Sequence, residues 1–67
     1  MVDVKELRLS LGVSRAEFAD AVGASPALVQ SWELGRRAPS GVAVKLLALL
    51  QRNPRLINEL RAVSVSV

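Results

Sequence analysis

The 67-residue sequence contains no cysteine and no histidine, which excludes disulfide bonds and the usual zinc sites. It also lacks tyrosine and a glycine-rich phosphate loop, and most of its six acidic residues are explained as helix caps or helix-surface charges. A catalytic site needs a nucleophile or base in surroundings that perturb it. The sequence therefore predicts no catalytic residues, no metal and no cofactor, and we expect a protein that is not an enzyme.

Long hydrophobic runs are also absent. The longest apolar stretch, Val42 to Leu50, is interrupted by Lys45 and is too short to span a membrane. The N-terminal residues lack the apolar segment of a secretory signal. Because a chain without cysteine suits a reducing compartment, we expect a cytoplasmic protein with no membrane partner.

The chain is short enough to lie near the lower limit for a domain that folds alone. Small domains usually gain stability from disulfides, a metal or a partner chain. Since the first two are excluded, we expect a homodimer. The net charge of +3 permits nucleic-acid binding, although many basic proteins of other kinds share such a charge.

Capping and stop signals divide the chain into five expected helices, which predicts an all-α domain. Polar residues that can cap a helix start precede most of them, and glycines follow the first three. The expected caps are Asp3, Ser14, Ser25 and Asn53, and the terminating glycines are Gly12, Gly23 and Gly35. The expected helices run from Val4 to Leu11, Ser14 to Gly23, Ser25 to Gly35, Ser40 to Arg52, and from Asn53-Pro54 onward.

The last two expected helices carry more apolar residues than one core needs. The fourth is apolar nearly all round, which predicts central burial or a second face buried against another subunit. The segment 63–67 alternates like a strand, although it can equally fray. We expect a domain over residues 1–62 and a tail over 63–67, with a dimer interface formed by Leu56, Ile57, Leu60, Val63 and Val65.

The stretch from Ser14 to Pro39 has the form of a helix-turn-helix. In the second of its helices, Val29 and Trp32 share one face, and small or polar side chains occupy the opposite face. The major groove admits one helix, so a DNA-reading helix must be anchored behind and small or polar in front. Two capped helices around a glycine turn also occur in other all-α domains, and Trp32 is better explained as core than as a base-stacking platform.

Cationic residues flank this stretch. Arg15 begins its first helix, where the positive end of the helix dipole favours phosphate, and Arg36 and Arg37 follow its second helix. Such contacts would position the protein on DNA without reading sequence. The alternatives are a solvated charge for Arg15 and a solubilising loop for the pair. The remaining cations are expected to be solvated: Lys5, Arg52, Arg55 and Arg61.

The segment SRAEFADAVGASPALVQSWELGRRAPS resembles the XRE-type helix-turn-helix family, which includes Cro-like phage repressors and many antitoxins. The likeness covers about residues 4–61, and PSGVAVKLLALLQRNPRLINEL is similar to the DNA-binding domains of MqsA-like and HigA-like antitoxins. The resemblance implies a compact five-helix, lambda-repressor-like domain that binds double-stranded DNA.

The resemblance also implies roles for single residues. The implied base-contacting residues are Pro26, Ala27, Gln30 and Ser31, and the phosphate-contacting ones are Arg15, Ser25, Arg36 and Arg37. Family members often carry Arg, Asn or Gln at the positions of Ala27 and Ser31, so Gln30 is left as the best reader of adenine. An ion pair between Arg8 and Glu33 is implied as well, whereas the local pattern alone treats both as surface charges.

Two functions remain open at this stage. The first is a homodimeric transcriptional autorepressor that binds an inverted repeat, a palindromic operator. The second is an antitoxin or protein-interaction module that neutralises a partner toxin. Many antitoxins bind their toxin through a segment outside the helix-turn-helix, and here only the first few residues and the tail remain outside it. This favours DNA as the main partner, or a chain that is a fragment of a longer protein.

Overall fold

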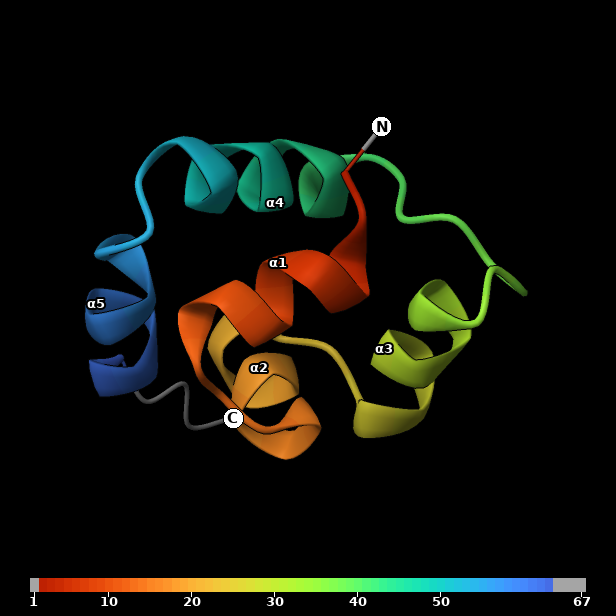
Figure 1. The fold of residues 1–67 in the computed structure, drawn as a ribbon, viewed down its shortest axis with the longest axis horizontal. Coiled ribbons are helices and arrows are strands. Elements are labelled where there is room, and N and C mark those ends of the chain that lie inside the picture. Colours follow the sequence, from red (N-terminus) through yellow and green to blue (C-terminus); the bar gives the residue numbers. More distant parts are fainter. Residues whose placement is uncertain (1, 64–67) are drawn as a thin grey trace.

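The computed structural model describes residues 2–63, and every regular element in that range is helical. The helices are α1 (Val4–Leu11), α2 (Arg15–Val22), α3 (Pro26–Glu33), α4 (Val42–Arg52) and α5 (Leu56–Ala62). Helix α1 lies in the middle, α4 runs along one side, α2 and α3 lie on the opposite side, and α5 closes one end (Figure 1). The expected all-α, five-helix fold is therefore confirmed. The alternating tail, including Val65, falls outside the described residues except for Val63.

The first three helices begin where the sequence predicts. The side chains of Asp3, Ser14 and Ser25 each accept a hydrogen bond from the backbone N–H three residues further on, at 3.0–3.1 Å. At Ser14 the capping box is complete, because the Ser14 N–H also donates to Oε1 of Glu17 at 2.8 Å. Each such cap contributes roughly 0.5–2 kcal/mol. The start of the helix-turn-helix is therefore fixed by residues adjacent in sequence.

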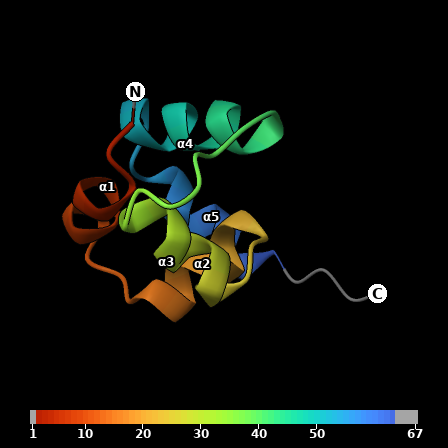
Figure 2. The ribbon, with the colours of Figure 1, turned by 90° about the vertical axis from the view of Figure 1, so that its right-hand side faces the viewer.

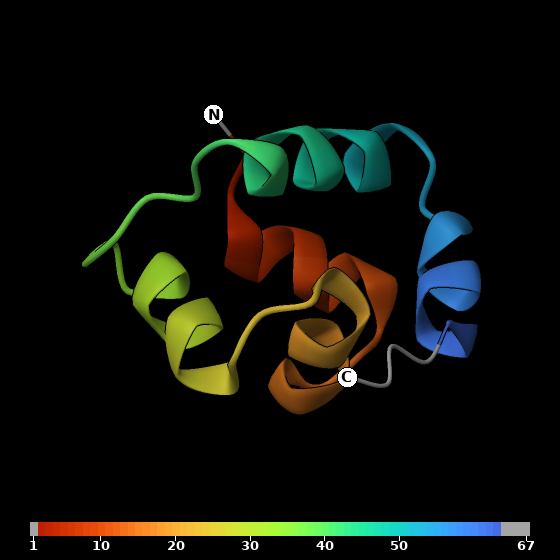
Figure 3. The same cartoon turned by 180° about the vertical axis from the view of Figure 1, so that it is seen from behind.

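Gly23 makes the turn between α2 and α3. Its φ of 77° lies in the left-handed region, where a side chain would crowd the following carbonyl. The next N–H, of Ala24, donates to the carbonyl of Ala19 at 2.9 Å and so closes α2. Seen from the other side, the chain passes from this turn directly into α3 (Figure 3).

The starts of the last two helices differ from the predictions. Helix α4 begins at Val42 rather than Ser40, because Gly41 has φ 59° and ψ −131°, which is not a helical conformation. Helix α5 begins at Leu56, and Asn53 does not cap it. Asn53 instead ends α4, since its N–H donates to the Leu49 carbonyl at 2.8 Å. Turns with hydrogen bonds between residues three apart then lead into α5.

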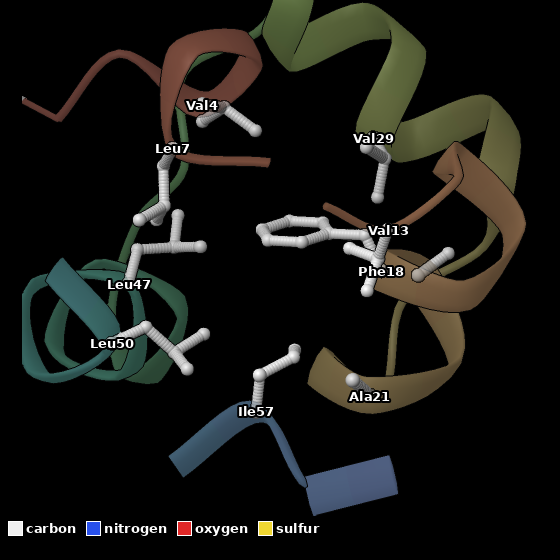
Figure 4. Close-up of a cluster of buried hydrophobic side chains, with 10 residues drawn as sticks. Val4, Leu7, Val13, Phe18, Ala21, Val29, Leu47, Leu50 and Ile57 are labelled. Carbon is white, nitrogen blue, oxygen red and sulfur yellow. The ribbon is translucent and has the colours of Figure 1, made fainter. Parts of the chain in front are cut away.

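The core forms around Phe18, whose ring is fully buried between α1, α4 and the helix-turn-helix (Figure 4). Leu47, Leu50 and Val29 are also fully buried. Burying each large apolar side chain contributes roughly 1.5–3 kcal/mol. All five helices supply core residues: Val4, Leu7, Val13, Phe18, Ala19, Ala21, Val29, Leu47, Leu50 and Ile57. This shared core holds α2 and α3 at a fixed angle.

Helix α4 is not centrally buried, so that version of the prediction is wrong. Leu47 and Leu50 face the core, but Val42 is 89% exposed and Val44 and Leu49 are about half exposed. The apolar residues of α4 that do not face the core therefore lie on the surface of this chain. The other alternative, a second face buried against another subunit, stays a prediction. None of the helices in the described part of the chain has the length and apolar character to cross a membrane.

Candidate nucleic-acid interface

Helices α2 and α3 pack against each other and present α3 at the surface (Figure 2). Val29 anchors the back of α3 because its side chain is completely buried. Trp32 is partly buried and packs against the same core, so it acts as core, as the sequence predicts. The helix is thus held from one side and open on the other, which is the arrangement that a groove-reading helix requires.

The open side of α3 carries the four residues expected to contact bases. Pro26, Ala27 and Gln30 are exposed, and Ser31 is partly buried. Only Gln30 among these has a long polar side chain, with an amide that can both donate and accept. The surface is therefore accessible but offers few hydrogen-bonding groups. Ser25 lies at its N-terminal edge, exposed, with its hydroxyl already accepting the Leu28 N–H.

The basic pair after α3 is held by the backbone. Gly35 has φ 74°, and its N–H donates to the Trp32 carbonyl at 3.2 Å. The Arg36 N–H then donates to the Ser31 carbonyl at 2.9 Å, which completes a glycine-ended helix terminus. Both Arg36 and Arg37 are exposed. The end of α3 thus fixes the main chain of the pair and leaves both guanidinium groups to solvent.

Glu33, the last residue of α3, has a buried carboxylate that is paired with Arg8 of α1. Its side chain is 2% exposed, and Arg8 Nε donates to its Oε2 at 2.7 Å. A second nitrogen of Arg8, Nη2, reaches Oε1 at 3.4 Å, and Nη1 donates to the Val13 carbonyl at 3.2 Å. The ion pair that the family resemblance implies is present in the structure. The interpretation of both residues as surface charges, based on local pattern, is wrong.

Arg15 completes a cluster that the sequence analysis missed. Its Nη2 lies 3.2 Å and its Nε 3.4 Å from Oε1 of Glu33, and its side chain is 41% exposed. The sequence offered either a phosphate contact or a solvated charge for this residue. Nothing in the local pattern signals a contact between the start of α2 and the end of α3, because that contact depends on how the two helices cross. Arg8, Glu33 and Arg15 are hereafter called the charge triad.

The carboxylate of the charge triad is ionised at neutral pH. Burial raises the pKa of Glu33, but hydrogen bonds from Arg8 and Arg15 outweigh that effect and lower it below its ordinary value. Two cations around one carboxylate leave the triad with an excess positive charge. That excess lies on the solvent side, because Arg15 is the more exposed arginine.

A second ion pair links α5 to the start of α2. Nη2 of Arg61 lies 2.8 Å from Oε2 of Glu17, and both side chains are nearly half exposed. The Ser14 N–H, the Ser14 hydroxyl and the Arg61 charge lower the pKa of Glu17, in that order of effect. Arg61 was expected to be solvated, and the structure instead places it on a residue of the capping box. Exposed pairs of this kind contribute little to stability.

The residues expected at a dimer interface are not all available to a partner. Ile57 is 6% exposed and belongs to the core, and Leu56 and Leu60 are partly buried against that core. Val63 is 62% exposed. A separate apolar groove of about 590 Å³ lies beside α4. Its lining consists of Val2, Pro39, Val44, Leu47, Ala48 and Gln51.

A helix-turn-helix family model matches residues 4–57 of the chain. Over 58 residues the chain is 38% identical to the "Uncharacterized HTH-type transcriptional regulator YiaG" of Escherichia coli (strain K12). It is 34% identical over 58 residues to "Antitoxin HigA-2" of Vibrio cholerae serotype O1. Each alignment covers 87% of this chain, but only 60% of YiaG and 56% of HigA-2. The chain thus spans less than two thirds of the length of these relatives.

The range matched by the family model includes the motifs that carry the resemblance: the S-x-x-E start, the glycine turn and the R-R-x-P-S exit. The range matched by the family model contains helices α1 to α4 and the first two residues of α5. Membership of this family indicates a DNA-binding domain rather than an enzyme. The chain belongs to the helix-turn-helix family, of the XRE type that its sequence resembles.

Proposed function

We propose that this domain binds operator DNA sequence-specifically as a homodimer and represses transcription of its own operon. The observation that carries the proposal is the exposed face of α3, anchored from behind by Val29 and bordered by arginines. Membership of the helix-turn-helix family supports the same assignment. In this proposal α3 enters the major groove and α2 lies across the backbone.

Within the groove, Gln30 is the principal reader. Its amide can form two hydrogen bonds with an adenine edge, worth roughly 1–3 kcal/mol of discrimination. Ala27 and Pro26 offer apolar contact, to which a thymine methyl is suited, and the Ser31 hydroxyl can bond a base edge. With so few direct readers, sequence-dependent DNA shape would supply part of the specificity.

Phosphate contacts would hold the domain in register. Arg36 and Arg37 follow the C-terminal end of α3, and Arg15 lies against Glu33 at that same end. Ser25 marks the opposite, N-terminal end of the helix. The three cations would grip one strand of the backbone while the serine approaches the other edge of the groove. Such contacts are indifferent to sequence.

Dimerisation would bring two reading helices to half-sites one helical turn apart, about 34–36 Å centre to centre. The apolar surface for it would come from the exposed parts of Leu56, Leu60 and Val63, together with Leu49 of α4. Sedimentation at micromolar concentration tests this step. A well-folded chain that remains strictly monomeric, with and without operator, would contradict the homodimer.

Selection of bound sites from random duplexes supplies the operator and tests specificity at once. On that site, Gln30→Ala should cost about 1–3 kcal/mol and change affinity for unrelated DNA little. Arg36→Ala should weaken binding to both by a similar factor and lower the salt slope by roughly 0.9. Arg55→Ala is the matched control, since Arg55 is an exposed cation directly before α5, and α5 lies at the opposite end of the molecule from α3 (Figure 1).

Two outcomes would refute sequence-specific repression. One is equal affinity of the wild-type chain for the selected operator and a scrambled duplex at physiological salt. The other is a selection that returns no enriched sequence. If binding is specific but Gln30→Ala leaves the sequence preference unchanged, the assignment of Gln30 as reader is wrong, and DNA shape must carry the preference.

A second candidate function is that of an antitoxin that also binds a toxin. The observation that favours it is the similarity to the Vibrio cholerae protein named Antitoxin HigA-2. Purification of the native protein from its own source should then bring down a protein partner in stoichiometric amount. Repeated isolation of the protein without such a partner would contradict this candidate and leave the repressor proposal intact.

A further inference from the structure

The two arginines of the charge triad use their guanidinium groups differently. Arg8 is 12% exposed, and all three of its side-chain nitrogens make hydrogen bonds, two to Glu33 and one to Val13. Arg15 places only Nε and Nη2 on Glu33. Its Nη1 makes no hydrogen bond within residues 2–63, and the side chain is 41% exposed. One arginine is thus fully engaged, and the other has one edge fixed and one edge free.

The distances show which arginine Glu33 holds more closely. The shortest contact with Arg8 is 2.7 Å, whereas the contacts with Arg15 are 3.2 and 3.4 Å, both to the shared oxygen Oε1. Short, charge-assisted hydrogen bonds are the stronger ones. Arg8 therefore supplies most of the charge compensation that burial of Glu33 requires. Arg15 adds a second cation whose charge is not cancelled.

We propose that Glu33 is a positioning residue, which fixes the Arg15 guanidinium so that its free edge meets a DNA phosphate at the start of α2. The inference rests on the proposed function, because it assigns a partner to Arg15 only when DNA is bound. A long side chain normally loses rotamer freedom on binding, and that loss weakens affinity. Because Glu33 already restricts the Arg15 side chain in the free protein, much of this rotamer freedom is lost before DNA binds.

The role also connects two contacts. Glu33 belongs to α3, which reads the groove, and Arg15 belongs to α2, which crosses the backbone. A phosphate bound by Arg15 therefore fixes the C-terminal end of α3 through a single carboxylate. Removing that carboxylate would leave the arginine in place but free to rotate.

A double-mutant cycle separates positioning from simple electrostatics. Kd for the selected operator is measured by fluorescence anisotropy, at one salt concentration, for wild type, Glu33→Gln, Arg15→Ala and the double variant. With Arg15 present, Glu33→Gln should weaken binding about three- to tenfold, as expected for one freed side chain. With Arg15 absent, the same change should not weaken binding, because only a negative charge near DNA is removed.

The matched control is Glu59→Gln, which removes one exposed negative charge from α5 without touching the charge triad. It should leave Kd unchanged or lower it slightly. If Glu33→Gln weakens binding by the same factor with and without Arg15, Glu33 acts through the fold alone and the positioning role is refuted. If the wild-type chain binds neither operator nor random duplex at low salt, the proposed function fails, and the positioning role fails with it.

A measurement on the wild-type chain covers the case in which Glu33→Gln does not fold. The Nε–H group of each arginine gives its own NMR signal, whose relaxation reports side-chain order on the ps–ns timescale. Before DNA is added, the Arg15 signal should be as ordered as nearby backbone, and the Arg36 signal should be mobile. Equal mobility of Arg15 and Arg36 in the free protein would overturn the proposal.

Discussion

Replacing Arg8 by alanine would leave the buried carboxylate of Glu33 with only its more exposed partner, Arg15. Removing one member of a buried ion pair typically costs about 3–5 kcal/mol. Arg15 remains at 3.2 Å but is 41% exposed, so solvent screens its attraction and it restores only a fraction of that energy. We expect a loss of about 2–4 kcal/mol at pH 7, against a total stability of roughly 3–10 kcal/mol for a chain of this size.

The pH dependence of the loss is more specific than its size. In the wild type the arginines lower the pKa of Glu33 despite burial, so its stabilising effect is full above the ordinary pKa of 4.5 and declines as the pH falls below it. In Arg8→Ala, burial would outweigh the remaining cation and raise that pKa. Protonation would then favour the folded variant as the pH falls.

The difference in unfolding free energy between the two proteins should therefore shrink from pH 7 to pH 4. Urea denaturation followed by circular dichroism at several pH values measures it, with Arg55→Ala as a control that should show no difference at any pH. A deficit that stays constant with pH would refute the argument that the cost comes from the buried charge. A deficit under about 1 kcal/mol at pH 7 would show that Arg15 alone satisfies Glu33.

Three further predictions concern stability and are read from the same urea curves. Leu47→Ala should lower the free energy of unfolding by about 2–5 kcal/mol, because Leu47 is only 1% exposed. Leu49→Ala should lower it by under about 1 kcal/mol, because Leu49 is about half exposed. Similar losses for the two variants would contradict the burial pattern of α4. Gly23→Ala should cost about 1–2 kcal/mol through its φ of 77°, and Gly23→Asn less; no cost for alanine would argue against the left-handed turn. Ser14→Ala should cost roughly 0.5–2 kcal/mol as a lost cap, and a neutral result would mean that the capping box contributes nothing.

The features that the sequence predicted correctly have short-range causes. The capping box at Ser14 and Glu17 spans four residues, and its hydrogen bonds form as soon as those residues enter a helix. Gly23 ends α2 because its own φ is positive. These signals also locate the helix-turn-helix, and hence the candidate interface.

The charge triad could not be predicted in the same way. Arg15 and Glu33 lie eighteen positions apart, and they meet only because α2 and α3 cross at a particular angle. The pair of Arg61 with Glu17 spans forty-four positions and depends on where α5 packs. Only family likeness pointed to Arg8 and Glu33. That likeness assigned Arg15 a phosphate contact and did not place it against Glu33.

The dipeptides Ser25-Pro26 and Asn53-Pro54 carry the same helix-start signal, a capping residue followed by proline, but only the first one starts a helix. Ser25-Pro26 starts α3 as predicted, because the turn at Gly23 separates it from α2. Asn53-Pro54 follows α4 directly, so the Asn53 backbone is used to end that helix and cannot adopt the capping conformation. The buried face of α4 could not be predicted for a related reason. Apolar residues surround the whole helix, so the sequence pattern does not distinguish the face that packs on the core from the face that stays exposed.

The exposed face of α3 has a consequence for how this protein can change over evolutionary time. Ala27 and Gln30 lie outside the core, and the anchoring of the helix depends on Val29 behind them. Substitutions at these two positions would therefore leave the folding energy nearly untouched while altering the side chains presented to a groove. In the proposed function, stability and target choice would be carried by different residues of one eight-residue helix. If the proposed function holds, a lineage with this scaffold would acquire a new binding site through one or two exchanges, without passing through an unstable intermediate.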